Sequence, residues 1–380
     1  MKPKQLPKDW KEVELGDIFI FQNKTGIKAG EGLEWGKYKF FTSSDIQSKF
    51  LDKFNFKGEH LIFSTGGKAG LHYCNEPFSA SNDCFVVKVN NKILTKYIYY
   101  YLFGKISLLE EGFRGAGLKH LSSNYLKKIK LIYPENKETQ QKIVSILEKA
   151  EALKQKREEA DKLTKKYLQS VFYEMFGDLN KNNKKFSKVS LSGVCEINPK
   201  KSELGNNYSK EVSFMTMADI GEEGQIYHIT IKNFNNVKKG FTYFRKNDVL
   251  FAKITPCMEN GKGAIAKIRT EVGFGSTEFH VLRPIKEKST SEWIYYLLSL
   301  KQIREKAEGN MTGSAGQKRV PSDFFDILQI PHPPIKLQNK FASIVEQVEK
   351  MKEKQKHSKE HIDNLFNALM QKAFNGELVR

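Results

Sequence analysis

Residues 140–178 read QQKIVSILEKAEALKQKREEADKLTKKYLQSVFYEMFGD, and this stretch decides the fold. It has no proline and no glycine before Gly177, and it is rich in Lys, Glu, Gln, Leu and Ala. Apolar residues recur at spacings of three and four, which is the pattern of a helix with one buried face. We therefore predict a long helix over 135–179, which at about 1.5 Å per residue would extend for roughly 60 Å.

A second stretch of the same character lies at 337–378 and reads LQNKFASIVEQVEKMKEKQKHSKEHIDNLFNALMQKAFNGEL. It predicts another long helix, over 336–380. Both helices have apolar ends and a small or polar middle along the seam, so antiparallel pairing as a coiled coil sets middle against middle. The predicted seam residues are Ile146, Leu153, Arg157 and Tyr167 in the first helix and Ile344, Met351, Gln355, Ile362 and Leu365 in the second.

The remainder of the chain is repeated too. YIYYYL at 97–102 matches WIYYLL at 293–298, and LIF at 61–63 matches VLF at 249–251. The offset between matches grows before Val249, which indicates about a dozen inserted residues in the second copy. Short apolar runs broken by Gly, Asn, Asp and Pro are typical of strands and loops, whereas 95–110 and 290–307 each read as a helix.

These patterns predict an α+β protein made of two repeated, mixed α/β domains separated by two long helices that pair as an antiparallel coiled coil. We expect the first globular domain over 1–134 and the central helix over 135–179. The second globular domain follows over 180–335, and the C-terminal helix occupies 336–380.

Positive charge is concentrated in the two globular parts. The chain has 63 Lys and Arg against 44 Asp and Glu, a net charge of +19. Basic and acidic residues number 21 and 13 in 1–133, 25 and 16 in 181–336, and 17 and 15 in the helical remainder. A codon bias toward Lys remains an alternative, but the Lys-rich helices would share it in full. The distribution favours binding of a polyanion, such as nucleic acid, by the globular domains.

Membrane and secretory classes have no support. The longest apolar run, 97–103, is far shorter than the roughly 18 residues of a membrane span, and the first residues lack the apolar stretch of a signal peptide. Four cysteines without a C-x-x-C pair fit a reducing compartment. We expect a cytoplasmic protein that does not contact a membrane.

Catalytic motifs are not found either. The sequence has no glycine-rich cofactor loop, no Asp- or Asn-Pro-Pro-aromatic turn of a methyltransferase, and no complete phosphate loop. The segment HSKEH at 357–361 matches an inverted zinc-protease pattern, but His357 and His361 flank the helix seam, where a solvated helix face is the simpler interpretation. We expect no catalytic residues, no metal and no cofactor.

Glycine-containing loops with basic and amide side chains lie at matched places in the repeat: 64–72 with 253–267, and 114–123 with 312–319. Such loops can approach a phosphate backbone and present donors to base edges. An ordinary solvated loop is the alternative for any one of them. The residues that we expect to contact DNA are Lys68, Arg114, Lys119, His120, Lys253, Lys262, Gln317, Lys318 and Arg319.

The doubled domain and the helix sequences together resemble the specificity (S) subunit of type I restriction-modification enzymes. The likeness is carried by LPKDWKEVELGDI at 6–18 and by the helical stretches at 140–178 and 337–378. The resemblance implies that two target-recognition domains each read one half of a bipartite, asymmetric double-stranded DNA target. It also implies that the helices set the spacer, that methyltransferase (M) subunits dock on the chain, and that restriction/translocase (R) subunits join for cleavage.

Two further expectations stay open at this stage. A non-catalytic coiled-coil scaffold or adaptor that binds proteins is the alternative function. We also expect Leu168 and Phe172 to be exposed beside the first helix seam, where they would form a docking surface for the methyltransferase.

Overall fold

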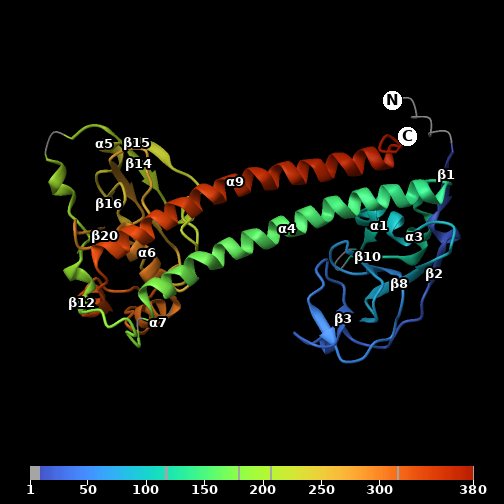
Figure 1. The fold of residues 1–380 in the computed structure, drawn as a ribbon, viewed down its shortest axis with the longest axis horizontal. Coiled ribbons are helices and arrows are strands. Elements are labelled where there is room, and N and C mark those ends of the chain that lie inside the picture. Colours follow the sequence, from blue (N-terminus) through green and yellow to red (C-terminus); the bar gives the residue numbers. More distant parts are fainter. Residues whose placement is uncertain (1–8, 116–118, 179, 206–207, 315, 380) are drawn as a thin grey trace. The chain divides into compact units, whose positions relative to one another are not determined.

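The computed structural model describes residues 9–115, 119–178, 180–205, 208–314 and 316–379. The chain divides into two compact units, the first formed by Met1–Glu159 with Gln355–Arg380 and the second by Ala160–Lys354. Two long helices, α4 (Lys137–Phe176) and α9 (Ile335–Phe374), each contribute one half to either unit (Figure 1). Helices and strands together confirm the predicted α+β class.

The globular part of the first unit contains three helices, eleven short strands and two 3-10 turns among its described residues. Its four-stranded sheet has the order β2-β8-β5-β6, its three-stranded sheet the order β4-β3-β7, and β1 pairs with β11. The elements are β1 (Trp10–Glu14), η1 (Leu15–Asp17), β2 (Phe19–Phe21), η2 (Ala29–Glu31), β3 (Tyr38–Phe41), β4 (Lys49–Leu51), β5 (His60–Ser64), β6 (Leu71–Cys74), β7 (Phe78–Ala80), β8 (Cys84–Val89), α1 (Thr95–Gly104), α2 (Ser107–Glu110), β9 (Phe113–Arg114), β10 (His120–Leu121), α3 (Ser123–Lys128) and β11 (Lys130–Pro134).

The second unit repeats this plan. Its sheet β13-β20-β17-β18 has the order of β2-β8-β5-β6, and β12 pairs with β21 as β1 pairs with β11. The elements are β12 (Lys188–Ser190), η3 (Leu191–Gly193), β13 (Cys195–Ile197), η4 (Lys201–Leu204), β14 (Glu211–Met215), η5 (Met217–Asp219), β15 (Thr230–Asn233), α5 (Phe234–Val237), β16 (Thr242–Arg245), β17 (Val249–Ala252), β18 (Gly263–Ile265), β19 (Val272–Gly275), β20 (Phe279–Pro284), α6 (Ser291–Ser299), α7 (Lys301–Gly309), α8 (Phe324–Ile327) and β21 (Gln329–Pro331).

The matched segments of sequence occupy matched places. LIF lies in β5 and VLF in β17, and both strands are central in their four-stranded sheets and buried. The strand β16 precedes Val249 in the predicted insertion and adds a fourth strand beside β19. The prediction of one helix each over 95–110 and 290–307 is wrong in detail. The second breaks at Leu300, whose backbone is extended with ψ 134°, so two short helices form instead of one.

The long helices pack onto their globular parts and against each other in antiparallel fashion. In the second unit, near the end of α4, Phe172 and Phe176 contact Phe341 near the start of α9 at centroid distances of 5.5 and 5.3 Å. In the first unit, Lys154 of α4 pairs with Asp363 of α9 at 3.2 Å. The chain leaves α4 through Gly177 in the left-handed conformation, φ 77°, which stops the helix.

The predicted seam is wrong at four of its nine residues. Leu153, Tyr167, Met351 and Leu365 are 50%, 49%, 41% and 49% exposed, whereas the residues that follow Ile146 and Tyr167, namely Leu147 and Leu168, are buried. The buried face of α4 follows steps of four and then three residues from Ile143, whereas the predicted seam used steps of three and then four. The difference moves every second seam position by one residue. The remaining predicted seam residues are half-buried: Ile146, Arg157, Ile344, Gln355 and Ile362.

The same shift overturns the predicted docking surface. Leu168 is 2% exposed and Phe172 is fully buried, because both belong to the core of the second unit. They contribute to folding and are not accessible to a partner. Separately, no helix among the described residues combines the length and apolar character needed to cross a bilayer.

Candidate nucleic-acid interface

In the first unit, a tight turn follows β5 and presents Lys68. The buried hydroxyl of Ser64 accepts a 2.5 Å hydrogen bond from the amide of Gly70 and donates one of 2.9 Å to the carbonyl of Lys68. Gly67 has a φ of 79°, which favours glycine at the tip of the turn. Because the turn is fixed from inside, the side chain of Lys68 stays exposed to solvent.

A hairpin formed by β9 and β10 lies against this turn. The amide of Leu121 donates a 2.9 Å hydrogen bond to the carbonyl of Thr65, and Nδ1 of His120 lies 3.2 Å from the same oxygen. His120 faces Arg114 across the hairpin. The two predicted loops of the first unit are thus joined, and Arg114, Lys119 and His120 are all exposed. The hairpin residues 116–118 lie outside the described part of the chain.

The second unit joins its two loops in the same way. The amide of Val320 donates a 2.9 Å hydrogen bond to the carbonyl of Lys253, and the amide of Thr255 donates one of 3.0 Å to Lys318. The backbone amide of Lys253 in turn donates a hydrogen bond to the carbonyl of Glu278 at 2.9 Å. The corresponding bond in the first unit runs from Thr65 to Asp83 at 3.0 Å.

This shared framework carries different side chains in the two units. Arg319 donates from Nε and Nη2 to the two carboxylate oxygens of Glu278, both at 2.9 Å. The hydrogen bond from Arg319 holds the pKa of the Glu278 carboxyl below its ordinary value. Lys262 is half-buried, and its ammonium group donates to the carbonyl of Met217 at 3.2 Å. One of its N–H donors is therefore already used within the protein. Lys253 is half-buried, whereas Gln317 and Lys318 are exposed.

Sequence reasoning missed Arg304 on α7. Its side chain is buried and donates to the carbonyls of Met258 and Gly261 at 3.0 and 3.2 Å, while its guanidinium lies 4.3 Å from the ring centroid of Phe251. Burial lowers the pKa of Arg304 to about 10. Arg304 thereby fixes the turn that leads to Lys262. Within an amphipathic helix rich in Lys and Glu, no feature of the sequence distinguishes this arginine from a solvated one.

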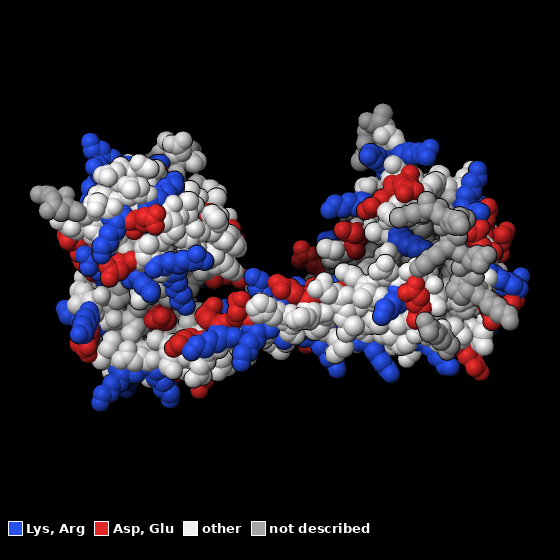
Figure 2. Space-filling model, turned by 90° about the horizontal axis from the view of Figure 1, so that it is seen from above, with Lys and Arg blue, Asp and Glu red and all other residues white. Residues whose placement is uncertain are grey.

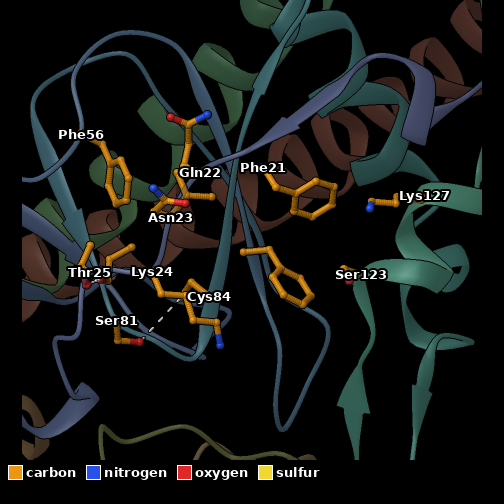
Figure 3. A pocket seen from close by; sticks show the side chains of 13 residues that line it. Phe21, Gln22, Asn23, Lys24, Thr25, Phe56, Ser81, Cys84, Ser123 and Lys127 are labelled. Carbon is orange, nitrogen blue, oxygen red and sulfur yellow. Dashed lines mark hydrogen bonds between the residues drawn. The ribbon is translucent and has the colours of Figure 1, made fainter.

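The first unit also contains a pocket of about 240 Å³ (Figure 3). The aromatic rings of Phe21 and Phe56 line it together with Lys24 and Lys127, and Nζ of Lys127 lies 5.3 Å from the centroid of Phe21. The lining residue Cys84 pairs with Ser64, where the turn begins. The pocket is therefore connected to this turn through the neighbouring strands β8 and β5.

The corresponding strands of the second unit bury a polar pair. His280 on β20 is 5% exposed. Its Nδ1 lies 3.0 Å from the side-chain nitrogen of Asn198, and its Nε2 lies 2.7 Å from the carbonyl of Val320. Burial lowers the pKa of His280, which favours the neutral imidazole. The two units thus differ both in their loops and in the sheet beneath the loops.

Charge is mixed over the surface. On the face drawn in Figure 2, basic and acidic side chains are interspersed on both globular parts. Within the described residues, no group of three or more His, Cys, Asp or Glu is placed to hold a metal ion. His357 and His361 lie exposed on α9, as a solvated helix face requires.

Comparisons with known proteins agree with the repeat. The family model described as type I restriction modification DNA specificity domain matches residues 7–163 and 183–364. The EcoEI specificity subunit of a type I restriction enzyme from Escherichia coli is 41% identical to this chain over 38% of the chain's residues. The matched part spans only a quarter of the length of that relative. The EcoDI specificity subunit, also from Escherichia coli, is 22% identical over 100% of the chain and 90% of its own.

A solved structure shares the fold. The crystal structure of the S subunit of a type I restriction-modification system from M. genitalium matches with a TM-score of 0.62 and 15% sequence identity. The match covers 98% of this chain and 99% of that one. The fold, with its two repeats and two long helices, therefore has a precedent in a known structure.

Proposed function

Because the chain belongs to the family of type I restriction modification DNA specificity domains, we propose that it is the non-catalytic, DNA-reading subunit of a type I restriction-modification enzyme in the cytoplasm. Each globular part reads one half of a bipartite DNA target. The helices α4 and α9 set the spacer between the halves and dock methyltransferase subunits, and restriction/translocase subunits complete the enzyme for cleavage.

One observation carries this proposal. The hydrogen bond from Leu121 to Thr65 in the first unit and the bond from Val320 to Lys253 in the second join equivalent loops, both at 2.9 Å. A shared backbone frame that presents different side chains suits the reading of two different sequences in equivalent ways. His120 in one unit and Arg319 in the other follow this pattern, so the two half-sites should differ.

The decisive experiment is to co-express the chain with its methyltransferase in cells free of other DNA methylation, and to map modified bases across the genome. We expect one split, asymmetric motif that disappears when the chain is omitted. A stable complex that produces no sequence-specific methylation would contradict the proposal.

Salt dependence separates this function from the protein-binding scaffold. Binding through several phosphates should weaken steeply between about 50 and 200 mM salt, because each contact releases counterions. Fluorescence anisotropy of the assembled complex on duplex DNA measures this slope. Tight partner binding with a flat salt response and no affinity for DNA would favour the scaffold.

A further inference from the structure

Three side-chain hydrogen bonds orient Arg319 on the proposed reading surface. Its backbone pairs with Thr312 through two hydrogen bonds of 2.9 and 2.8 Å, and it also forms a bridge with Ile254 on the adjoining loop. Both oxygens of Glu278 hold one edge of the guanidinium, and Nη1 donates to the carbonyl of Gln317 at 2.9 Å. The guanidinium plane is therefore set before any ligand arrives.

This arrangement leaves a donor pair available. A guanidinium carries five N–H donors, and the hydrogen bonds to Glu278 and Gln317 use three of them, so one N–H remains on Nη1 and one on Nη2. The side chain is 41% exposed, whereas that of Glu278 is 25% exposed. Glu278 therefore supports the guanidinium from the more protected side.

We propose that Arg319, oriented by Glu278, reads a guanine in the half-site bound by the second unit. The inference rests on the proposed function and names one base of its target. The O6 and N7 atoms of guanine present two adjacent acceptors in the major groove. Two guanidinium N–H donors fit this guanine edge better than they fit the edge of any other base.

A backbone phosphate is the competing ligand for such a fork. The Glu278 carboxylate offsets the positive charge of Arg319 and would repel a phosphate placed beside it, whereas a guanine edge carries no net charge. Exposed Lys318, one residue earlier, is better suited to a phosphate. The ion pair therefore favours base reading at Arg319.

The described residues of the first unit do not contain an equivalent arginine–carboxylate pair at this place. By the match of Leu121 with Val320, His120 occupies the place of Arg319, and its Nδ1 lies 3.2 Å from the carbonyl of Thr65. An imidazole cannot present two parallel donors to one base edge. Variation at Arg319 should therefore change only the half-site of the second unit.

The test is to map genome methylation directed by the wild-type chain, Arg319→Gln, Arg319→Lys and Glu278→Gln, each co-expressed with the methyltransferase. We expect the wild type to require guanine at one position of one half-site. Arg319→Gln should lower that preference roughly 10- to 100-fold and leave the other half-site unchanged. Arg319→Lys should lower it less, because a lysine can also donate to O6 and N7 of guanine. Glu278→Gln should relax the same position less. His120→Ala is the matched control and should affect only the opposite half-site.

Three results would overturn the inference. The first is a wild-type motif that has no guanine in the half-site left intact by His120→Ala, and the second is an unchanged motif in both Arg319 variants. The third is a uniform fall in methylation at all sites, which would indicate a phosphate contact. Arg319→Lys keeps a cation beside Glu278 and serves if Arg319→Gln fails to fold. Failure of the proposed function is a separate outcome, because the wild-type chain would then direct no split motif at all.

Discussion

Gln140 and Gln338 share two equivalent hydrogen bonds in the two halves of the chain, and Gln338 also donates to the carbonyl of Lys288 at 3.0 Å. Both side chains are fully buried near the start of a long helix. The carbonyl oxygen of Gln140 accepts from the amide of Leu94 at 2.9 Å, and that of Gln338 accepts from Thr290 at 3.1 Å. Each side-chain nitrogen donates at 2.9 Å to a proline carbonyl just before its helix. Each glutamine thus joins a long helix to the start of α1 or α6.

Replacing either glutamine should destabilise its own unit. Gln140→Leu keeps the volume but leaves a buried amide and a buried carbonyl without partners, so we expect a loss of about 2–4 kcal/mol in the free energy of unfolding. Urea denaturation measures this loss. Gln141→Leu, at the exposed neighbouring position, is the control and should change stability by about 0.5 kcal/mol or less. Equal effects of the two variants would contradict the assigned role.

The corrected helix face predicts unequal roles for two leucines of α4. Leu147 is fully buried in the core of the first unit, whereas Leu153 is 50% exposed. Leu147→Ala should lower the free energy of unfolding by about 2–5 kcal/mol, because it leaves a cavity. Leu153→Ala should cost about 0.5 kcal/mol or less. Thermal denaturation compares the two, and a larger loss from Leu153→Ala would restore the seam first predicted from sequence.

A buried ion pair anchors the second unit. Arg283 donates to both oxygens of Asp248 at 2.9 and 2.8 Å and to Glu203 at 2.6 Å, and the side chain of Asp248 is only 3% exposed. Arg283→Met would leave the Asp248 carboxylate buried without its cation, at a cost of about 3–5 kcal/mol. The double variant Arg283→Met, Asp248→Asn should recover part of that loss in denaturation experiments. No recovery would show that the damage comes from packing and not from the uncompensated charge.

The Glu278–Arg319 pair predicts a pH dependence. The hydrogen bonds from Arg319 lower the pKa of the Glu278 carboxyl from its ordinary value of 4.5. The folded state therefore binds the carboxyl proton more weakly than the unfolded state does. The resulting stabilisation is present in full above the ordinary pKa and is lost as the pH falls through the lowered one. The difference in melting temperature between the wild type and Glu278→Gln should therefore shrink as the pH falls from above 4.5 through the lowered pKa. A difference that stays constant over this range would contradict the assigned ion pair.

The repeat could be predicted from sequence because short apolar runs keep their order in both copies. Leu61 and Val249 illustrate this, since each begins a match that lies in a central strand. The phase of the helices could not be fixed in the same way. Ile146 and Leu147 are adjacent and apolar, so either one fits a spacing of three or four from Ile143. Packing against the globular part, which decides the choice, depends on distant residues.

The candidate interface was predictable only in outline. Glycine-containing loops at matched positions indicated Lys68 and Arg319, but the partner of Arg319 is Glu278, 41 residues away along the chain. The buried Arg304 escaped for the same reason, because its partners Met258 and Gly261 are more than 40 residues distant. Spacing along a sequence carries no information on such contacts, which depend on how the strands pair.

The proposed ruler role of α4 and α9 leads to a prediction about the DNA target. Removing one heptad from each helix, residues 156–162 and 355–361, keeps the phase of both buried faces and shortens each helix by about 10 Å. At about 3.4 Å per base step, this corresponds to about three base pairs. Methylation mapping should then reveal a shorter spacer between two unchanged half-sites. Removing four residues from each helix is the control, since it rotates the buried faces and should impair folding. A stable heptad-deletion variant that methylates the original motif with the original spacer would refute the ruler role, because the helix length would then have no effect on the separation of the half-sites.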